Sequence, residues 1–258
     1  MFAYDIGRTL DDPPTHGEGP MATNTTKEIL KELQGYGDAA TKKMLLNNGA
    51  HEPVFGVKVS DLKKIVKRVK KDHALSLELW ATGNSDAMYL AALIADEDKV
   101  TKSDLTKWVN SAYWPWLSEF SVPWVAAESR YGFELGLKWI DSKKENVASS
   151  GWGTLAYYPA IKADDELDLD VYRQLLERVE QNVHKDQNRV SHTMNAFVIA
   201  VGSYIKPLTK EASATAKRIG KVEVDMGNTA CKVPLAVDAI KKVAARGSLG
   251  KKRKTARC

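Results

Sequence analysis

The chain has 258 residues and a net charge of +5, with 43% apolar residues, so it is long enough to bury one large core. Its two cysteines, Cys231 and Cys258, form no Cys-x-x-Cys pair, and its five histidines show no i, i+4 pairing, so neither a disulfide framework nor a metal site is predicted. No apolar run approaches the length of a membrane helix. We expect a cytoplasmic, monomeric protein with no membrane span, no metal and no cofactor.

Residues 1–24 are predicted to be a disordered N-terminal extension. The first 20 of them mix acidic residues with prolines and glycines and offer no apolar face that a core could use. A Met at position 21 is an alternative natural start.

Helical patterns recur from residue 25 to residue 245. The first begins at the capping box Thr25-Thr26-Lys27-Glu28. Further helices are predicted over 38–47, 60–71, 75–80, 86–95, 101–109, 122–139, 145–158, 169–183, 190–204, 207–219 and 234–245. Only residues 222–225 alternate like a strand, and they are too few to found a sheet. Helix pairs at a spacing of about 40 residues predict an all-α fold, an α-solenoid of HEAT-like repeats, in one domain over 25–245.

The helix predicted over 60–71 has two contrasting faces. Leu62, Ile65, Val66 and Val69 form one apolar stripe. The opposite face is cationic and holds Lys63, Lys64, Lys67, Arg68, Lys70 and Lys71. Such a face is typical of any solvated surface helix, and it would also suit one wall of a phosphate-binding surface.

Six of the seven tryptophans lie between residues 108 and 152. Such a cluster is typical of the middle of a helical core, or of a groove that takes a flat or cationic ligand. Pro115 separates Trp114 from Trp116, and because proline disturbs a continuing helix, a new helix must begin close to this point. We expect that Trp114 and Trp116 are not both core residues.

The last 13 residues, 246–258, form a basic C-terminal tail. They contain six cations and no acid, which are Arg246, Lys251, Lys252, Arg253, Lys254 and Arg257. Without these six, 32 of the 38 basic residues remain against 33 acidic residues, so the rest of the chain is close to neutral. A short basic tail is typical of a solvated, flexible end and also of a segment that follows a phosphate backbone.

Three groups of residues carry a family resemblance. They are Gly56-Val57-x-x-x-Asp61-Leu62-Lys63-Lys64, then Leu79-Trp80-x-x-Gly83 before Leu90-Ala91, and Trp139-Ile140-Asp141-Ser142. Over roughly residues 25–220 the chain resembles the DNA alkylation repair family, the HEAT-like alkylpurine DNA glycosylases related to AlkD. The resemblance implies a helical solenoid whose concave, basic face holds duplex DNA, and an activity that removes cationic alkylated purines.

The resemblance also places the site residues. The family's catalytic helix reads Trp-Trp-Asp-x-x-Asp and matches residues 113–118, so Trp114 takes the second Trp and Ser118 stands where the catalytic Asp belongs. The family's assisting Arg falls near Ser149 and its second Trp near Ile199. Glu119 follows Ser118 and would replace the missing carboxylate if the helix register shifted by one residue.

We therefore expect a protein that binds duplex DNA, alkylated DNA included, and that excises alkylated purines slowly or not at all. The residues expected to contact DNA are Trp114, Trp116, Ser118 and Ser149, and in the tail Lys251, Lys252, Arg253 and Lys254. Two alternatives remain open. One is an active glycosylase with Glu119 as its catalytic carboxylate, and the other is a non-catalytic scaffold that binds another protein along the same concave face.

Overall fold

The computed structural model describes residues 25–229 and 231–257, and within these ranges every regular element is a helix. The α-helices are α1 (Thr26–Gly35), α2 (Ala39–Asn47), α3 (Val59–Val69), α4 (His73–Ala81), α5 (Ser85–Ile94), α6 (Lys102–Ser111), α7 (Val122–Glu128), α8 (Gly132–Trp139), α9 (Glu145–Ile161), α10 (Leu169–Asn182), α11 (Asn188–Tyr204), α12 (Thr209–Ile219) and α13 (Ala236–Ala245). Shorter helices are the π-helix η1 (Trp116–Ser121) and the 3-10 helices η2 (Asp164–Glu166) and η3 (Lys206–Leu208). The extension predicted over 1–24 lies outside the described residues.

Local side-chain caps explain where several of these helices begin. Thr25 and Glu28 form the predicted capping box at the start of α1, and Thr101 and Asp104 form a second one at the start of α6. At the start of α2, Asp38 accepts a hydrogen bond from the amide of Thr41. Each cap satisfies an amide that the first helical turn leaves without a partner.

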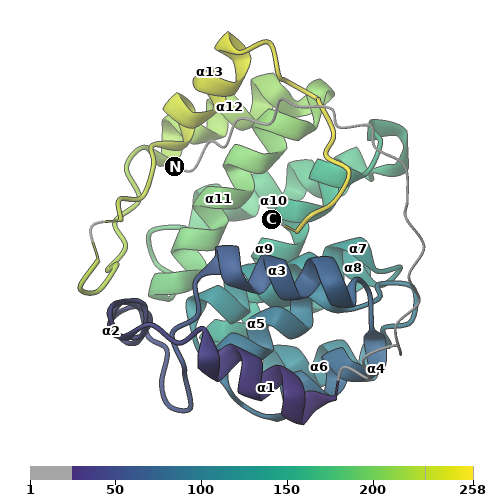
Figure 1. Cartoon of the computed structure of the whole chain (residues 1–258). Coiled ribbons are helices and arrows are strands. Elements are labelled where there is room, and N and C mark those ends of the chain that lie inside the picture. The colour runs from purple at the N-terminus through teal and green to yellow at the C-terminus, as the bar shows by residue number, and fades with distance from the viewer. Residues whose placement is uncertain (1–24, 230, 258) are drawn as a thin grey trace.

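Helices α3 to α13 stack in two rows, and this arrangement is the predicted α-solenoid (Figure 1). In the first row α3, α5, α7, α9, α11 and α13 follow one another, each in contact with the next. The second row holds α4, α6, α8, α10 and α12, each of which packs on at least one helix of the first row. The N-terminal helices α1, α4 and α6 lie at the opposite end of the molecule from α12 and α13 (Figure 1). The predicted all-α class and solenoid architecture are thus confirmed.

Most of the tryptophan cluster is core. Trp108, Trp124, Trp139 and Trp152 are all buried, and Trp80 stacks on Trp108 with 4.2 Å between ring centroids. Each indole supplies a large apolar area to the core.

The helix predicted over 122–139 is interrupted, which corrects that prediction. α7 ends at Glu128, and Ser129 adopts an extended conformation with φ −75° and ψ 161°. Its hydroxyl donates to the carbonyl of Ala126 at 2.8 Å and accepts from the amide of Tyr131 at 3.2 Å. Serine thus offers the backbone an alternative to continued helix, and α8 begins only at Gly132.

The C-terminal segment does not extend as a free end but packs back across the first row of helices (Figure 1). The amide of Gly250 donates a hydrogen bond to the carbonyl of Ser203 at 2.8 Å, and the amide of Arg253 donates one to the carbonyl of Ala160 at 2.7 Å. Arg257 is buried and forms ion pairs with Glu128 at 2.8 Å and Glu97 at 3.1 Å. The tail therefore differs from the solvated, flexible end that its composition indicates.

In the described part of the chain, no helix combines the length and the apolar character needed to cross a membrane.

Candidate functional site

The chain changes its helical geometry at the stretch that resembles the family's catalytic helix. Pro115 caps η1, in which the amide of Val122 bonds to the carbonyl of Leu117 five residues earlier. Such a π-turn holds one more residue than an α-helical turn, and π-turns are frequent at functional sites. Glu119, whose catalytic role would require a shifted register, lies within this π-helix.

Trp114 and Trp116 stack on each other beside this π-helix, with 5.3 Å between ring centroids and 14° between the ring planes. Trp114 is buried, whereas Trp116 is partly exposed and also contacts Tyr89. As expected, the pair is not wholly core, and Trp116 is the member that reaches the surface.

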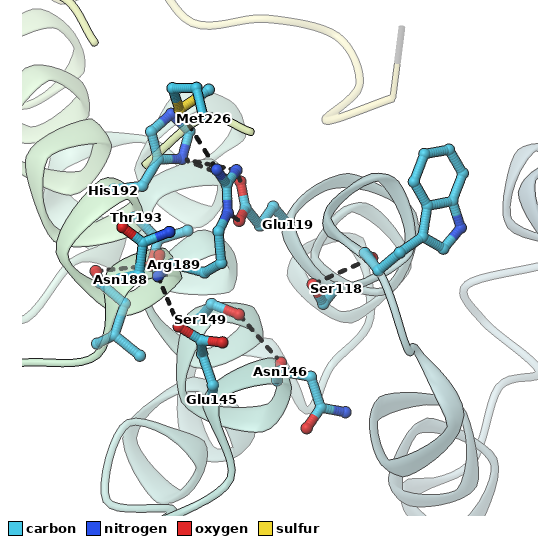
Figure 2. Close-up of polar contacts among 12 residues, drawn as sticks. Ser118, Glu119, Glu145, Asn146, Ser149, Asn188, Arg189, His192, Thr193 and Met226 are labelled. Carbon is cyan, nitrogen blue, oxygen red and sulfur yellow. Dashed lines mark hydrogen bonds and ion pairs between the residues drawn. The ribbon is translucent and has the colours of Figure 1, made fainter. Parts of the chain in front are cut away.

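Ser118 and Ser149 both lie inside the protein. The hydroxyl of Ser118 donates to the carbonyl of Trp114 at 3.2 Å, and that of Ser149 donates to the carbonyl of Asn146 at 3.2 Å (Figure 2). The carbonyl of Ser118 accepts a 2.6 Å hydrogen bond from the hydroxyl of Ser150 on α9, which ties η1 to that helix. Contact of either serine with DNA stays a prediction, and both hydroxyls already bond to main-chain carbonyls.

Glu119 points away from Ser118 and toward α11, where it meets two cationic or titratable side chains (Figure 2). Nε of Arg189 lies 2.6 Å from one carboxylate oxygen and Nη2 lies 2.7 Å from the other, a bidentate pair. Nδ1 of His192 lies 3.0 Å from the second oxygen. The side chain of Glu119 is 2% exposed, so its charge is compensated inside the protein rather than by water.

The sequence of α11 explains why these two partners converge. Arg189 and His192 are three residues apart and therefore lie on one face of the helix. The amide of Arg189 donates to the Glu145 carboxylate at 2.8 Å, which joins the first turn of α11 to that of α9. The sequence analysis did not predict Arg189 or His192 as site residues, because Glu119 and Arg189 are 70 positions apart. The local pattern that could have indicated them is the Arg-x-x-His spacing at the start of a helix.

A pocket of about 210 Å³ opens beside the Glu119–Arg189–His192 cluster. Its walls come mainly from α9 and α11, with Phe120 of η1 at one side and Arg253 of the tail at another. Ile199, the position where the resemblance places the family's second Trp, is one of the lining residues. The lining is predominantly apolar and is formed by Glu119, Phe120, Gly153, Ala156, Tyr157, Ala160, His192, Thr193, Ala196, Ile199, Ala200, Tyr204 and Arg253.

The four tail cations predicted to contact DNA fall into two groups. Nζ of Lys252 donates to the carbonyls of Pro159 and Tyr204 and to Asp164, at 2.6 to 3.0 Å, so its charge is used within the protein. Lys251, Arg253 and Lys254 are exposed.

The cationic face of α3 divides similarly. Lys64 pairs with Asp61, Arg68 with Glu32 and Lys71 with Glu97. Lys63, Lys67 and Lys70 are exposed on the same helix or at its end. This distribution of charges fits both interpretations of the α3 face, a solvated surface and one wall of a phosphate-binding surface.

Comparison with known proteins identifies the family. Residues 29–219 match the family described as DNA alkylation repair enzyme. Two uncharacterised proteins, from Listeria innocua and Listeria monocytogenes, are each 33% identical over 225 residues, which is 84% of this chain and 96% of theirs.

A solved structure gives the same answer. It is described as a new family of proteins related to the HEAT-like repeat DNA glycosylases with affinity for branched DNA structures. It shares 37% identity and a TM-score of 0.84 with this chain, and the match covers 91% of this chain and 100% of the other. The chain belongs to the DNA alkylation repair enzyme family.

Proposed function

We propose that this protein binds branched DNA by recognising its shape, and that it excises alkylated purines slowly or not at all. The observation that carries the proposal is the state of Glu119, the carboxylate nearest in sequence to the position of the family's catalytic Asp. It is buried and held by Arg189 through both carboxylate oxygens and by His192 through one of them. The 37% identical relative described as having affinity for branched DNA supports the binding half of the proposal.

Electrostatics links this geometry to weak excision. An alkylated purine is a good leaving group, so a glycosylase mainly has to stabilise the cationic sugar that develops as the glycosidic bond breaks. Ser118 offers a neutral, buried hydroxyl at the family's position. The Glu119 carboxylate is compensated by a guanidinium 2.6 Å away, so it offers little net negative charge to a second cation.

Phosphate contacts supply the affinity in this proposal. The exposed lysines of α3 and the exposed tail cations lie on a chain with a net charge of +5. Contacts of this kind release counterions, so we expect binding that depends weakly on sequence and strongly on salt.

A second candidate is an active glycosylase that uses Glu119. Glu119 lines the pocket and lies in the π-helix, where the backbone departs from α-helical geometry, and both observations favour this candidate. The two candidates differ in one measurable property, which is the release of methylated base.

The test combines binding and excision. Three-way junctions, four-way junctions and linear duplexes of shared sequence are compared at one salt concentration, and we expect the junctions to bind more tightly. Equal affinity for duplex and junction would show that the protein does not recognise the branch. Failure to bind any DNA would favour the protein-binding scaffold instead.

Release of 3-methyladenine and 7-methylguanine from alkylated DNA is measured in the same preparations. We expect little release from the wild type and no further loss in Glu119→Gln. Vigorous release that Glu119→Gln abolishes would establish the glycosylase and identify Glu119 as its carboxylate. Release gained in Ser118→Asp would show that the scaffold is competent and lacks only the acid.

A further inference from the structure

Small residues of two neighbouring helices line the pocket beside Glu119. On α9 these are Gly153, Ala156 and Ala160, and on α11 they are Ala196 and Ala200. The spacing of three to four residues aligns each set along one helix face. The helices pack closely, yet the small side chains leave a hollow of about 210 Å³. This is smaller than the roughly 300–1,000 Å³ of pockets that enclose drug-sized ligands, so it suits one ring system.

Aromatic side chains give this hollow flat walls. Phe120, Tyr157 and Tyr204 all line it. Phe120 and Tyr157 both pack against the buried ring of Trp124, with centroids 5.9 and 6.3 Å away. Because Trp124 holds them from behind, these two rings are in place before any ligand arrives, which lowers the cost of ordering on binding.

Polar side chains also line the pocket. The Glu119 carboxylate lies 3.0 Å from Nδ1 of His192, and Nη2 of Arg189 lies 3.4 Å from the same nitrogen. Arg253 lines the pocket from the tail, and its Nη2 donates to the carbonyl of Arg257 at 3.1 Å. An apolar slot with flat walls and a cationic edge complements a nucleotide, whose base is flat and whose phosphate is anionic.

We propose that this pocket holds a single unstacked nucleobase from the branch point of a bound DNA junction, with the adjoining phosphate near Arg253. The proposal rests on the proposed binding of branched DNA and names the part of that DNA that enters the protein. Unpaired bases are the least costly to move out of a stack, so a branch point supplies the ligand where a continuous duplex does not. The site reads the presence of a base rather than its identity, since every base has a π-face.

The test uses three junctions that differ in one group. The first is a three-way junction with one unpaired nucleotide at its branch point, the second carries an abasic analogue at that position, and the third is fully paired. We expect the wild type to bind the first about tenfold more tightly than the second, as for other bases that stack on aromatic side chains.

The variant Ala196→Leu fills the pocket without changing any charge, and leucine is a strong helix former. It should bind the first two junctions equally, at the wild-type affinity for the abasic one. Ala214→Leu is the matched control, because Ala214 is half-buried on α12 in the other row of helices and should leave the preference intact.

The outcomes separate the two proposals. Equal wild-type affinity for the base-bearing and abasic junctions, or a preference that survives in Ala196→Leu, would overturn the pocket while leaving branch recognition in place. Absence of binding to all three junctions would reject the proposed function and the pocket with it. A preference abolished in Ala196→Leu and kept in Ala214→Leu would support both.

Discussion

At the scale of single residues, the buried carboxylate of Glu119 forms an ion pair that holds parts of the fold together. Moving an isolated carboxylate out of water costs several kcal/mol, and the cost is offset only when the partner geometry is good. Glu119 meets that condition through the two short contacts from Arg189, which itself also contacts the sulfur of Met226 at 3.4 Å. The cluster thereby joins η1, the start of α11 and the loop before α13.

Removing the guanidinium should therefore be costly. Arg189→Met leaves the Glu119 carboxylate buried without its main partner, and we expect the free energy of unfolding to fall by about 3 kcal/mol in urea titrations. Arg173→Met is the control, since Arg173 pairs with Asp170 and Glu211 at an exposed site and its removal should cost less than about 1 kcal/mol. Equal costs in the two variants would show that Glu119 is not held by this pair.

At the scale of elements, the C-terminal segment joins consecutive helices of the first row. Lys252 bonds to carbonyls near the C-terminal ends of α9 and α11, and Arg257 bonds to the carbonyls of Leu93 and Ala95 at the end of α5. Glu128, the last residue of α7, accepts from the amide of Ala256 at 2.7 Å. Cations beside the carbonyl ends of helices interact favourably with their dipoles.

Acid should weaken this attachment. Burial by itself raises the pKa of Glu97. Hydrogen bonds from Lys71 and from its own amide, together with the positive charge of Arg257, outweigh this effect. The net result is a pKa below the ordinary value of 4.5. Because the folded pKa is the lower one, this carboxylate contributes stability above the ordinary carboxyl pKa. The contribution disappears as the pH falls through the folded pKa.

Thermal unfolding across this window tests the attachment. We expect the Tm of the wild type to fall more steeply than that of Glu97→Gln as the pH drops from about 6 to about 3. Glu134→Gln removes a carboxylate of α8 that is 62% exposed, and it serves as the control for the loss of one acid. Parallel curves for the wild type and Glu97→Gln would exclude this contribution.

At the scale of the whole molecule, the proposed contact with DNA phosphates depends on the charges that face solvent. Lys251 and Lys254 are exposed on the segment that crosses the first row of helices, whereas Lys252 and Arg257 hold that segment in place. Deleting residues 247–258 would therefore remove the cations proposed to bind phosphate and the structural anchors together. A sharper experiment changes only the exposed cations.

The double variant Lys251→Gln/Lys254→Gln should weaken DNA binding and reduce the slope of log K against log salt by about 2, because each lysine that neutralises a phosphate adds about one unit to that slope. The double variant Lys210→Gln/Lys217→Gln is the matched control, because these exposed lysines lie on α12 in the second row. Fluorescence titrations at several salt concentrations give both slopes. An unchanged slope in the first variant would mean that this segment does not bind phosphates.

Much of the architecture follows from local sequence. Local patterns span only three or four residues, so they can be predicted without knowing the fold. Examples are the capping boxes at Thr25 and Thr101 and the apolar stripe of α3. The break at Ser129 was not legible, because a serine is tolerated inside helices and only its hydrogen bonds to the neighbouring turn show that the helix ends there.

The sequence by itself thus determined the all-α class and the solenoid of paired helices, and its resemblance to the family made Trp114, Ser118 and Glu119 candidate site residues. Only the tertiary structure decided what Glu119 does, because Arg189 is 70 residues away and no local periodicity brings the two together. It also decided that the basic tail packs against the helices and that small residues on α9 and α11 enclose a pocket. The physical reason is the same in each case: hydrophobic periodicity specifies which face of a helix is buried, but which partner meets that face depends on how distant segments stack.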